Sequence, residues 1–339
     1  MARRGWNTLA DRPATCLIRG TGSYMPPRIL TNHDLERLVE TSDEWITTRT
    51  GIRERRIADP DVASSDLAYE AAILALAAAD MEPTDIDVII VATVTPDHVF
   101  PSCGCTLQAR LGARQAAAFD VTAACSGFLY ALQVGRSMIL AGTAQRVLIV
   151  GVEVLSRIID WSDRSTCVLF GDGAGAVVLT PSNEAGRGVL SVKIGSDGEQ
   201  GEVLYLPAGG SRHPATHETV EQHLHFVHMS GNDLFKTAVR GMELVARQAL
   251  DEVGMSVGEI DLLVPHQANL RIIDATARRL EVPMEKVVVN IDRYGNTSAA
   301  SIPIALDEAV RGGRIHPGST IVMVAFGGGL TWGAAVVKW

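Results

Sequence analysis

The sequence predicts an α/β fold built from two fused copies of one unit. Two observations support this prediction. Short apolar segments alternate with amphipathic helical segments, and several segments of the first half recur in the same order in the second half. Such alternation produces sheets whose faces are covered by helices. Of the 339 residues, 47% are hydrophobic and 20% are charged, which is typical of a globular protein with a sizeable core.

The internal repeat begins with an alanine-rich amphipathic helix, expected near 65–80 and again near 231–253. Each helix leads through a similar turn into a short buried strand, in ADMEPTDIDVIIV at 79–91 and VGMSVGEIDLLV at 253–264. Repeated segments of this length indicate a duplicated structural unit.

The likeness continues toward the end of each half. RVLIV at 146–150 matches TIVMV at 320–324, and LFGDGAGAVVL at 169–179 resembles AFGGGLTWGAAVV at 325–337. Each half should therefore end in a glycine-turned hairpin. The polar stretch at 183–188 marks the division, so we predict halves of residues 15–184 and 185–339, with a site at the interface between them.

Charge and hydropathy exclude some classes of protein. The formal net charge of −9 argues against a general nucleic-acid-binding protein, which usually presents a basic face. No apolar run approaches the roughly 18–20 residues that span a membrane. The start, MARRGWNTLADRPATC, lacks the apolar core of a signal peptide and is interpreted as a short leader. We expect a cytoplasmic protein that binds neither nucleic acid nor membrane.

The cysteines do not suggest a disulfide framework, because they are scattered and odd in number. Cys103 and Cys105 form a CxC pair, but no second pair of cysteines or histidines lies nearby, so no metal site is expected. The five are Cys16, Cys103, Cys105, Cys125 and Cys167.

Cys125 is the candidate nucleophile. It follows the apolar run AAAFDV, interpreted as a buried strand, and precedes Phe128, Leu132 and Ile139, which share one helical face. The helix dipole and free N–H groups at such a junction favour the thiolate. A backbone N–H there could also stabilise an oxyanion. An inert buried cysteine is the alternative interpretation.

His266 and Asn296 lie at comparable junctions of the second half. His266 follows a strand that ends at Val264, and the carboxyl end of a strand is where α/β sheets collect catalytic groups. Asn296 lies where a strand should lead through a turn into a helix that begins near Ser298. The repeat relates this junction to the one that holds Cys125, so both helix starts should face one centre. The alternatives are a surface histidine and a helix-capping asparagine.

Two glycine loops and a histidine-rich segment complete the candidates. GDGAG at 171–175 and GGG at 327–329 lack the spacing of phosphate-binding loops and are interpreted as tight turns. An N–H of the second loop could complete an oxyanion hole. Residues 211–228 hold five irregularly spaced histidines with few carboxylate neighbours, and are interpreted as a flexible polar insertion.

Several motifs together resemble the β-ketoacyl-acyl carrier protein synthase III family of the thiolase superfamily. CSGF surrounds Cys125, PHQANLRI surrounds His266 and YGNTSAAS surrounds Asn296. TSDEWITTRTGIRERRI at 41–57, FGDGAG at 170–175 and FGGGLTWG at 326–333 resemble the family too. The motifs follow the family order from about residue 15 to the end of the sequence.

The resemblance implies a duplicated, five-layered αβαβα thiolase-like fold, normally a homodimer. Cys125 would take an acyl group from acyl-CoA, a substrate rather than a cofactor. Malonyl-acyl carrier protein would then lose CO2, and the resulting carbanion would attack the acyl-cysteine. His266 and Asn296 would donate hydrogen bonds as enolate charge develops. The N–H groups of Cys125 and Gly328 would form a second oxyanion hole.

The resemblance also assigns binding residues, position by position. A tryptophan and arginines suit the adenine and phosphates of CoA. Phe100 matches the position that reaches across the dimer into the partner's acyl pocket. A basic patch would receive the acidic carrier protein, although a solvated helix face explains the same arginines. The CoA set is Trp45, Arg49, Arg164, Asn232 and Phe235, and the patch is Arg271, Lys236, Arg278 and Arg279.

Other functions remain open. A relative from specialised metabolism could make an alkylquinolone or polyketide starter, or transfer the acyl group to oxygen, with the same three residues. A non-catalytic partner subunit usually lacks the nucleophile, whereas Cys125 is present. A Cys-His-Asn hydrolase has the same residue order, but the duplicated halves do not fit a papain-like chain.

Overall fold

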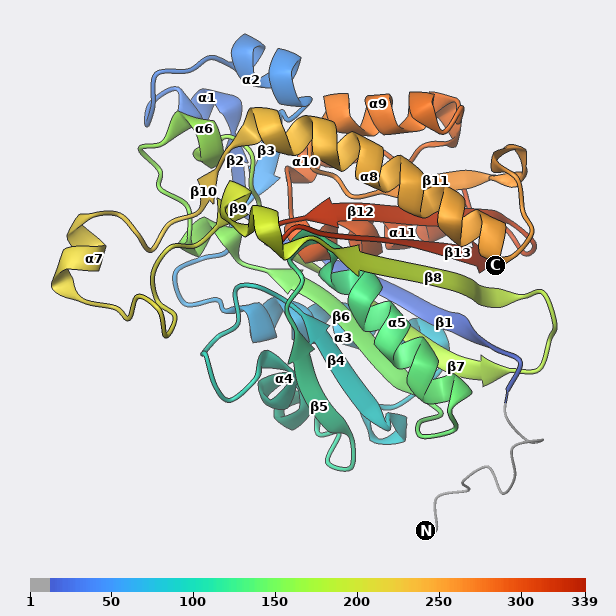
Figure 1. The fold of residues 1–339 in the computed structure, drawn as a ribbon. Helices are drawn as coiled ribbons and strands as arrows, with labels where there is room; N and C mark the ends of the chain where they lie inside the picture. The colour runs from blue at the N-terminus through green and yellow to red at the C-terminus, as the bar shows by residue number, and fades with distance from the viewer. Residues whose placement is uncertain (1–12) are drawn as a thin grey trace.

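Two β-sheets, separated and covered by helices, form the body of the protein (Figure 1). The computed structural model describes residues 13–339, without the side chains of 232–234. The first sheet has the order β1-β7-β6-β4-β5 and the second the order β11-β12-β13-β8. Their bounds are β1 Thr15–Tyr24, β4 Val88–Ala92, β5 Ala117–Val121, β6 Val147–Glu153, β7 Gly173–Ser182, β8 Gly188–Ser196, β11 Leu262–Pro265, β12 Thr320–Gly327 and β13 Thr331–Lys338.

The two sheets share one plan. In each, two parallel neighbours, β4 with β6 or β11 with β12, are followed by an antiparallel strand, β7 or β13. A further antiparallel strand, β1 or β8, closes the row. The strands of the first sheet all lie within 15–182 and those of the second within 188–338. This arrangement matches the repeat in the sequence.

Strand alternation separates the layers. In β6, Val147 and Ile149 face the middle helices, while Leu148 and Val150 face an outer cluster with α3 and α4. The second sheet is likewise buried on both faces, against α5 and α11 inside and α8 and α9 outside. Figure 1 shows the resulting five layers. The main helices are α3 Ser64–Ala79, α4 Cys103–Leu111, α5 Gly127–Leu140, α8 Gly231–Glu252, α9 Leu270–Arg279 and α11 Ser301–Arg311.

The shorter elements lie mostly at one end of the two sheets (Figure 1). The two sheets and the three helix layers around and between them confirm the five-layered αβαβα fold that the resemblance implied. The shorter elements are β2 Ile29–Thr31, α1 Asn32–Leu35, α2 Asp43–Thr50, β3 Glu54–Arg56, α6 Arg164–Cys167, β9 Leu204–Tyr205, α7 His217–Glu221, β10 His228–Met229 and α10 Ile291–Tyr294.

Three local expectations were wrong. A tight glycine turn joins β12 to β13, but β6 and β7 are separated by residues 154–172, which include α6. The strand expected before Asn296 is reduced to a single bridge between Val287 and Leu263. The strand before Cys125 is β5, an edge strand whose residues are only half-buried or exposed, because no strand among residues 13–339 covers its outer side.

The two halves meet where glycines admit the backbone of the other half. A Cβ added to Gly151 of β6 would lie 2.3 Å from the carbonyl oxygen of Ala299, at the start of α11. A Cβ added to Gly327 of β12 would lie 2.7 Å from the backbone nitrogen of Cys125, at the start of α5. Each contact is possible only without a side chain. Each helix start is thus held, backbone to backbone, against a strand of the other half.

We predict that Gly151→Ala destabilises the protein by about 1–3 kcal/mol, because the new methyl group must displace the backbone at Ala299. Gly198→Ala is the matched control, since a Cβ there meets no atom within 4 Å. Denaturant unfolding of both variants measures the difference. Equal stability of the two variants would show that the contact at Gly151 is not a constraint.

Candidate active site

Cys125 lies at the carboxyl end of the first sheet, as the sequence predicted. It sits in a short 3-10 turn, Ala124–Ser126, that leads from β5 into α5. The sulfur is not a thiolate at rest, contrary to the expectation from the helix start. Burial, with a smaller contribution from the charge of Glu153, raises the pKa of the Cys125 thiol to about 12, although an interaction with Ser298 lowers it. Loss of the thiol proton must therefore accompany the reaction.

His266 is buried and oriented by α11. It follows β11 directly, and its Nδ1 lies 2.6 Å from the hydroxyl oxygen of Ser301. The backbone N–H of Gln267 donates to the same oxygen at 3.4 Å, so the Ser301 proton is directed at Nδ1. In the tautomer in which Nδ1 accepts from Ser301, the imidazole proton lies on Nε2. Burial lowers the pKa of His266 to about 3, so the ring is neutral.

Asn296 is held with its amide group in a defined orientation. The backbone N–H of Ser298 donates to its Oδ1 at 2.9 Å, which leaves the Nδ2 group as the donor available to the cavity. Its backbone N–H donates to Leu169 and its carbonyl accepts from Gly171, so the turn is fixed to the segment before β7. Asn296 and His266 are therefore both preorganised as hydrogen-bond donors.

Two cavities meet at Cys125. The first, of about 140 Å³, is lined by Cys125, His266 and Asn296 together with residues of α8 and α9. The second, of about 190 Å³, is lined by Cys125 and Gly328 and is otherwise mostly apolar, with Leu155, Leu206 and Val227 in its wall. The three residues predicted from separate motifs thus share one cavity, and Cys125 alone of them reaches the other.

One buried acidic group, whose charge acts on Cys125, was missed by the sequence reasoning. Glu153 ends β6, is fully buried, and accepts hydrogen bonds from the Thr95 hydroxyl at 2.6 Å and the Val94 N–H at 3.1 Å. The signal was present as an acidic residue that closes the apolar run RVLIVGVE. The hydrogen bonds of Glu153 tie the end of β6 to the residues that follow the neighbouring parallel strand β4.

The predicted CoA residues gather at a tryptophan on α2. The guanidinium groups of Arg49 and Arg164 lie 4.7 and 4.8 Å from the centroid of the Trp45 ring. Phe235 lines the first cavity. The side chain of Asn232 lies outside the part of the chain that the structure describes.

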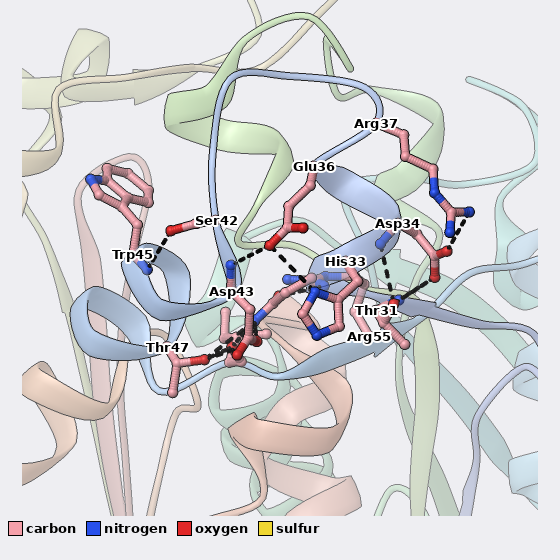
Figure 2. A network of polar contacts seen from close by, with 12 residues as sticks. Thr31, His33, Asp34, Glu36, Arg37, Ser42, Asp43, Trp45, Thr47 and Arg55 are labelled. Atoms are coloured by element: carbon pink, nitrogen blue, oxygen red, sulfur yellow. Dashed lines mark hydrogen bonds and ion pairs between the residues drawn. The ribbon is translucent and has the colours of Figure 1, made fainter.

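A buried polar network positions this tryptophan (Figure 2). Arg55 is fully buried and bonds to the side-chain oxygen of Asn32 at 2.9 Å and to the Val168 carbonyl at 2.8 Å. Asn32 in turn donates to Asp43 in the first turn of α2. Arg55 thereby connects α2, which carries Trp45, to the segment that follows Arg164.

Two of the four residues of the predicted basic patch form ion pairs within the protein. Arg271 lies over the Phe235 ring at 5.7 Å, and Lys236 is exposed one residue further along α8. Arg278 is paired with Asp274, and Arg279 is paired with Glu243. Arg271 and Lys236 therefore remain as the main candidates for docking. They lie near the first cavity, where α8 and α9 are side by side.

Phe100 is one of the most exposed apolar residues, with 84% of its surface accessible, and Val99 beside it is 92% accessible. Neither residue lines either of the two cavities that meet at Cys125.

Clusters of metal ligands and membrane-spanning helices are both absent from the described residues, 13–339 without the side chains of 232–234. No group of three or more potential metal ligands occurs there. His223 instead pairs with Asp160 at 2.8 Å, and His225 contacts Thr219. In the same range, no helix has both the length and the apolar character required to cross a bilayer.

Comparison with known proteins identifies the family. The model of 3-oxoacyl-[acyl-carrier-protein (ACP)] synthase III matches residues 119–198, and the model of its C-terminal part matches residues 250–339. The β-ketoacyl-[acyl-carrier-protein] synthase III of Caldanaerobacter subterraneus subsp. tengcongensis is 56% identical over 95% of this chain and 97% of its own.

Solved structures that are similar to this chain point to the same family. The 3-oxoacyl-[acyl-carrier-protein] synthase III of Aquifex aeolicus superimposes with a TM-score of 0.88 at 50% identity, covering 96% of this chain and 100% of its own. The priming β-ketosynthase of the R1128 polyketide pathway has a TM-score of 0.88 at 37% identity, covering 96% of this chain and 97% of its own. The chain therefore belongs to the β-ketoacyl-acyl carrier protein synthase III family of the thiolase superfamily.

Proposed function

We propose that this protein condenses an acyl-CoA primer with malonyl-acyl carrier protein, releases CO2, and so initiates fatty-acid synthesis. The observation that carries the proposal is the junction of two cavities at Cys125, one of them shared with His266 and Asn296. One cavity can hold the acyl chain while the other admits each thioester in turn. Acyl-CoA is a substrate here, and the reaction requires no further cofactor.

Acylation is the first half-reaction. Cys125 attacks the thioester carbonyl, and the N–H groups of Cys125 and Gly328 stabilise the oxyanion. Close approach of the loop supports this role, because Gly327 packs directly against the backbone nitrogen of Cys125. The apolar wall of the second cavity suits the acyl chain.

Decarboxylation is the second half-reaction. Nε2–H of His266 and Nδ2–H of Asn296 bind the thioester oxygen as CO2 leaves and enolate charge develops. Neutral donors are appropriate, since both are buried and a carboxylate at either position would repel the enolate. The carbanion then attacks the acyl-Cys125 thioester and releases the β-ketoacyl-carrier protein.

CoA binds across Trp45. The two guanidinium groups that cover the indole ring, those of Arg49 and Arg164, can separate to admit the adenine and pair with phosphates. Phe235 and Asn232 flank the channel toward Cys125. The acidic carrier protein docks at the same mouth through Arg271 and Lys236, with Arg278 and Arg279 at the margin.

The active form is a cytoplasmic homodimer. The exposed loop with Val99 and Phe100 precedes α4, which is tied to the edge strand β5 by a 2.7 Å hydrogen bond from the Cys103 N–H to Asp120. A second copy that covers β5 buries this apolar loop and brings Phe100 to the partner's acyl pocket.

A second candidate comes from specialised metabolism, because a priming β-ketosynthase of a polyketide pathway has the same fold at 37% identity. Acyl transfer to oxygen belongs to the same alternative. Incubation with acyl-CoA and malonyl-acyl carrier protein distinguishes these reactions. Transfer of the acyl group to another acceptor without release of CO2 would exclude condensation.

Radiolabelled acyl-CoA should label the parent protein and Cys105→Ser equally, and should leave Cys125→Ser unlabelled. Cys105 is the matched control because its thiol is exposed, whereas that of Cys125 is buried. Protein-bound radioactivity after denaturation measures the result. Undiminished label on Cys125→Ser would disprove the assignment of the nucleophile.

Asn296→Ala should retain acylation and slow decarboxylation of malonyl-acyl carrier protein by about 100–1,000-fold, the usual effect of removing one oxyanion donor. Labelling of Cys125 and release of CO2 are measured on the same preparation. An equal loss of both activities would assign Asn296 a structural role.

Arg271→Gln should raise the KM for malonyl-acyl carrier protein about tenfold and reduce its dependence on salt, because an exposed interfacial charge is removed. Arg278→Gln is the matched control, since Asp274 already pairs with that arginine. Steady-state kinetics with varied carrier protein provide the comparison. Similar KM values for the two variants would contradict a docking role for Arg271.

A further inference from the structure

Arg55 of β3 is a fully buried arginine that joins three separate segments. In the described part of the chain, its hydrogen bonds all go to uncharged oxygens: the Leu30 carbonyl at 3.1 Å, the Asn32 side chain at 2.9 Å and the Val168 carbonyl at 2.8 Å. A planar guanidinium suits this arrangement, because it directs several N–H groups at fixed angles. Arg55 therefore serves as a rigid joint between segments rather than as half of an ion pair.

One arm of this joint leads to the helix that carries Trp45. Asn32 is buried and accepts the bond from Arg55 through its Oδ1. Its Nδ2 group donates to the Asp43 carboxylate at 2.9 Å and to the Ile52 carbonyl at 2.8 Å. Asp43 begins α2 and Ile52 follows its end, so this arm holds both ends of the helix (Figure 2).

The other arm leads to the second arginine over the Trp45 ring. Val168, whose carbonyl accepts from Arg55, directly follows α6, and α6 begins with Arg164. The guanidinium of Arg164 also donates to the Glu40 carbonyl at 2.9 Å, just before α2. The two segments that present guanidinium groups to Trp45 are thus both attached to Arg55.

The segment held by this second arm also places Asn296. The Leu169 carbonyl accepts the Asn296 N–H at 2.8 Å, and the Gly171 N–H donates to the Asn296 carbonyl at 3.0 Å. A Cβ added to Gly295 would lie 3.3 Å from the Cβ of Arg55, so Arg55 packs directly against this turn as well. The turn of Asn296 is therefore fixed by a segment that Arg55 holds one residue away, at the Val168 carbonyl.

Trp45, Arg49 and Arg164 are together called the CoA clamp below. We propose that Arg55 is a positioning residue that aligns the CoA clamp with the Asn296 amide, so that one buried side chain serves both half-reactions. The inference deepens the proposed function and rests on it. Arg55 acts through its neighbours, because a fully buried side chain does not contact either substrate.

Three reactions separate this role from a general contribution to stability. Acyl-CoA uses the CoA clamp through its nucleotide, whereas acyl-pantetheine with the same acyl group has no nucleotide. Both acylate Cys125 through the N–H groups of Cys125 and Gly328, without Asn296. Decarboxylation of malonyl-acyl carrier protein uses Asn296 but no nucleotide. Loss of Arg55 should therefore impair the first and third reactions and spare acylation by acyl-pantetheine.

The test measures kcat/KM for labelling of Cys125 by radiolabelled acyl-CoA and acyl-pantetheine, and the release of CO2, in Arg55→Met. Methionine fills much of the space and leaves no buried charge unpaired, because the lost bonds go to uncharged oxygens. The preference for acyl-CoA over acyl-pantetheine should fall about 10–100-fold, the usual cost of misplacing a substrate-positioning group. Decarboxylation should slow about tenfold, while acylation by acyl-pantetheine stays within about twofold of the parent.

Substitutions of Asp43 test the first arm alone. Asp43→Ala removes the acceptor for Asn32, so it should lower the preference for acyl-CoA about tenfold and leave decarboxylation unchanged. Asp43→Asn keeps an acceptor oxygen and should retain the preference. Both variants lose the same charge at the start of α2, so an effect on the helix dipole is equal in the two.

Two further variants keep the test decisive. Thr21→Val removes a buried hydrogen bond to Asp307 of α11, at 2.7 Å, which belongs to neither arm. It controls for lost stability and should leave all three reactions unchanged. Where Arg55→Met does not fold, Arg55→Lys replaces it: the charge remains, but one ammonium group replaces the fork. The preference for acyl-CoA and the rate of decarboxylation should again fall.

An Arg55→Met protein that keeps either the preference for acyl-CoA or the parent's rate of decarboxylation would overturn the proposal. So would an equal loss of all three reactions, which indicates a general structural defect. The same holds if Asp43→Ala and Asp43→Asn behave alike. A parent with equal kcat/KM for the two thioesters would refute the CoA clamp itself, and a parent without label on Cys125 would refute the proposed function.

Discussion

The backbone-to-backbone contact between the two halves is the constraint on which the site depends. Gly151 of β6 meets the start of α11, and Gly327 of β12 meets the start of α5. Each half therefore sets the position of a functional turn that belongs to the other half. Cys125 and Asn296 come together because each helix start packs against a central strand of the other half, at a glycine that leaves no side chain in the contact.

Dehydration of this centre determines its chemistry. His266, Asn296 and Cys125 are all buried, so the imidazole is neutral and the sulfur carries a proton. Fixed, uncharged donors are effective in such a site because they need no reorganisation when charge develops. The same burial makes ionisation of the Cys125 thiol unfavourable.

Much of this architecture could be predicted from the sequence. The repeat indicated the two similar sheets, and the motifs located Cys125, His266 and Asn296, which line one cavity. Local patterns failed where tertiary context decides. The apolar run of β5 does not reveal an edge strand, and a glycine pattern does not reveal that residues 154–172 separate β6 from β7. The state of the Cys125 thiol depends on burial, which a helix start does not report. Glu153 was missed because its hydrogen-bond partners, at residues 93–95, follow a different strand of the sheet.

The division of labour between the two donor pairs is the central claim, and a crystal structure of the Cys125 acyl-enzyme tests it most directly. The account predicts that the thioester oxygen accepts hydrogen bonds from the N–H groups of Cys125 and Gly328, that the acyl chain enters the cavity walled by Leu155, Leu206 and Val227, and that His266 and Asn296 stay available for the second substrate. An acyl group on another residue, or a thioester oxygen bound by His266 and Asn296, would contradict it.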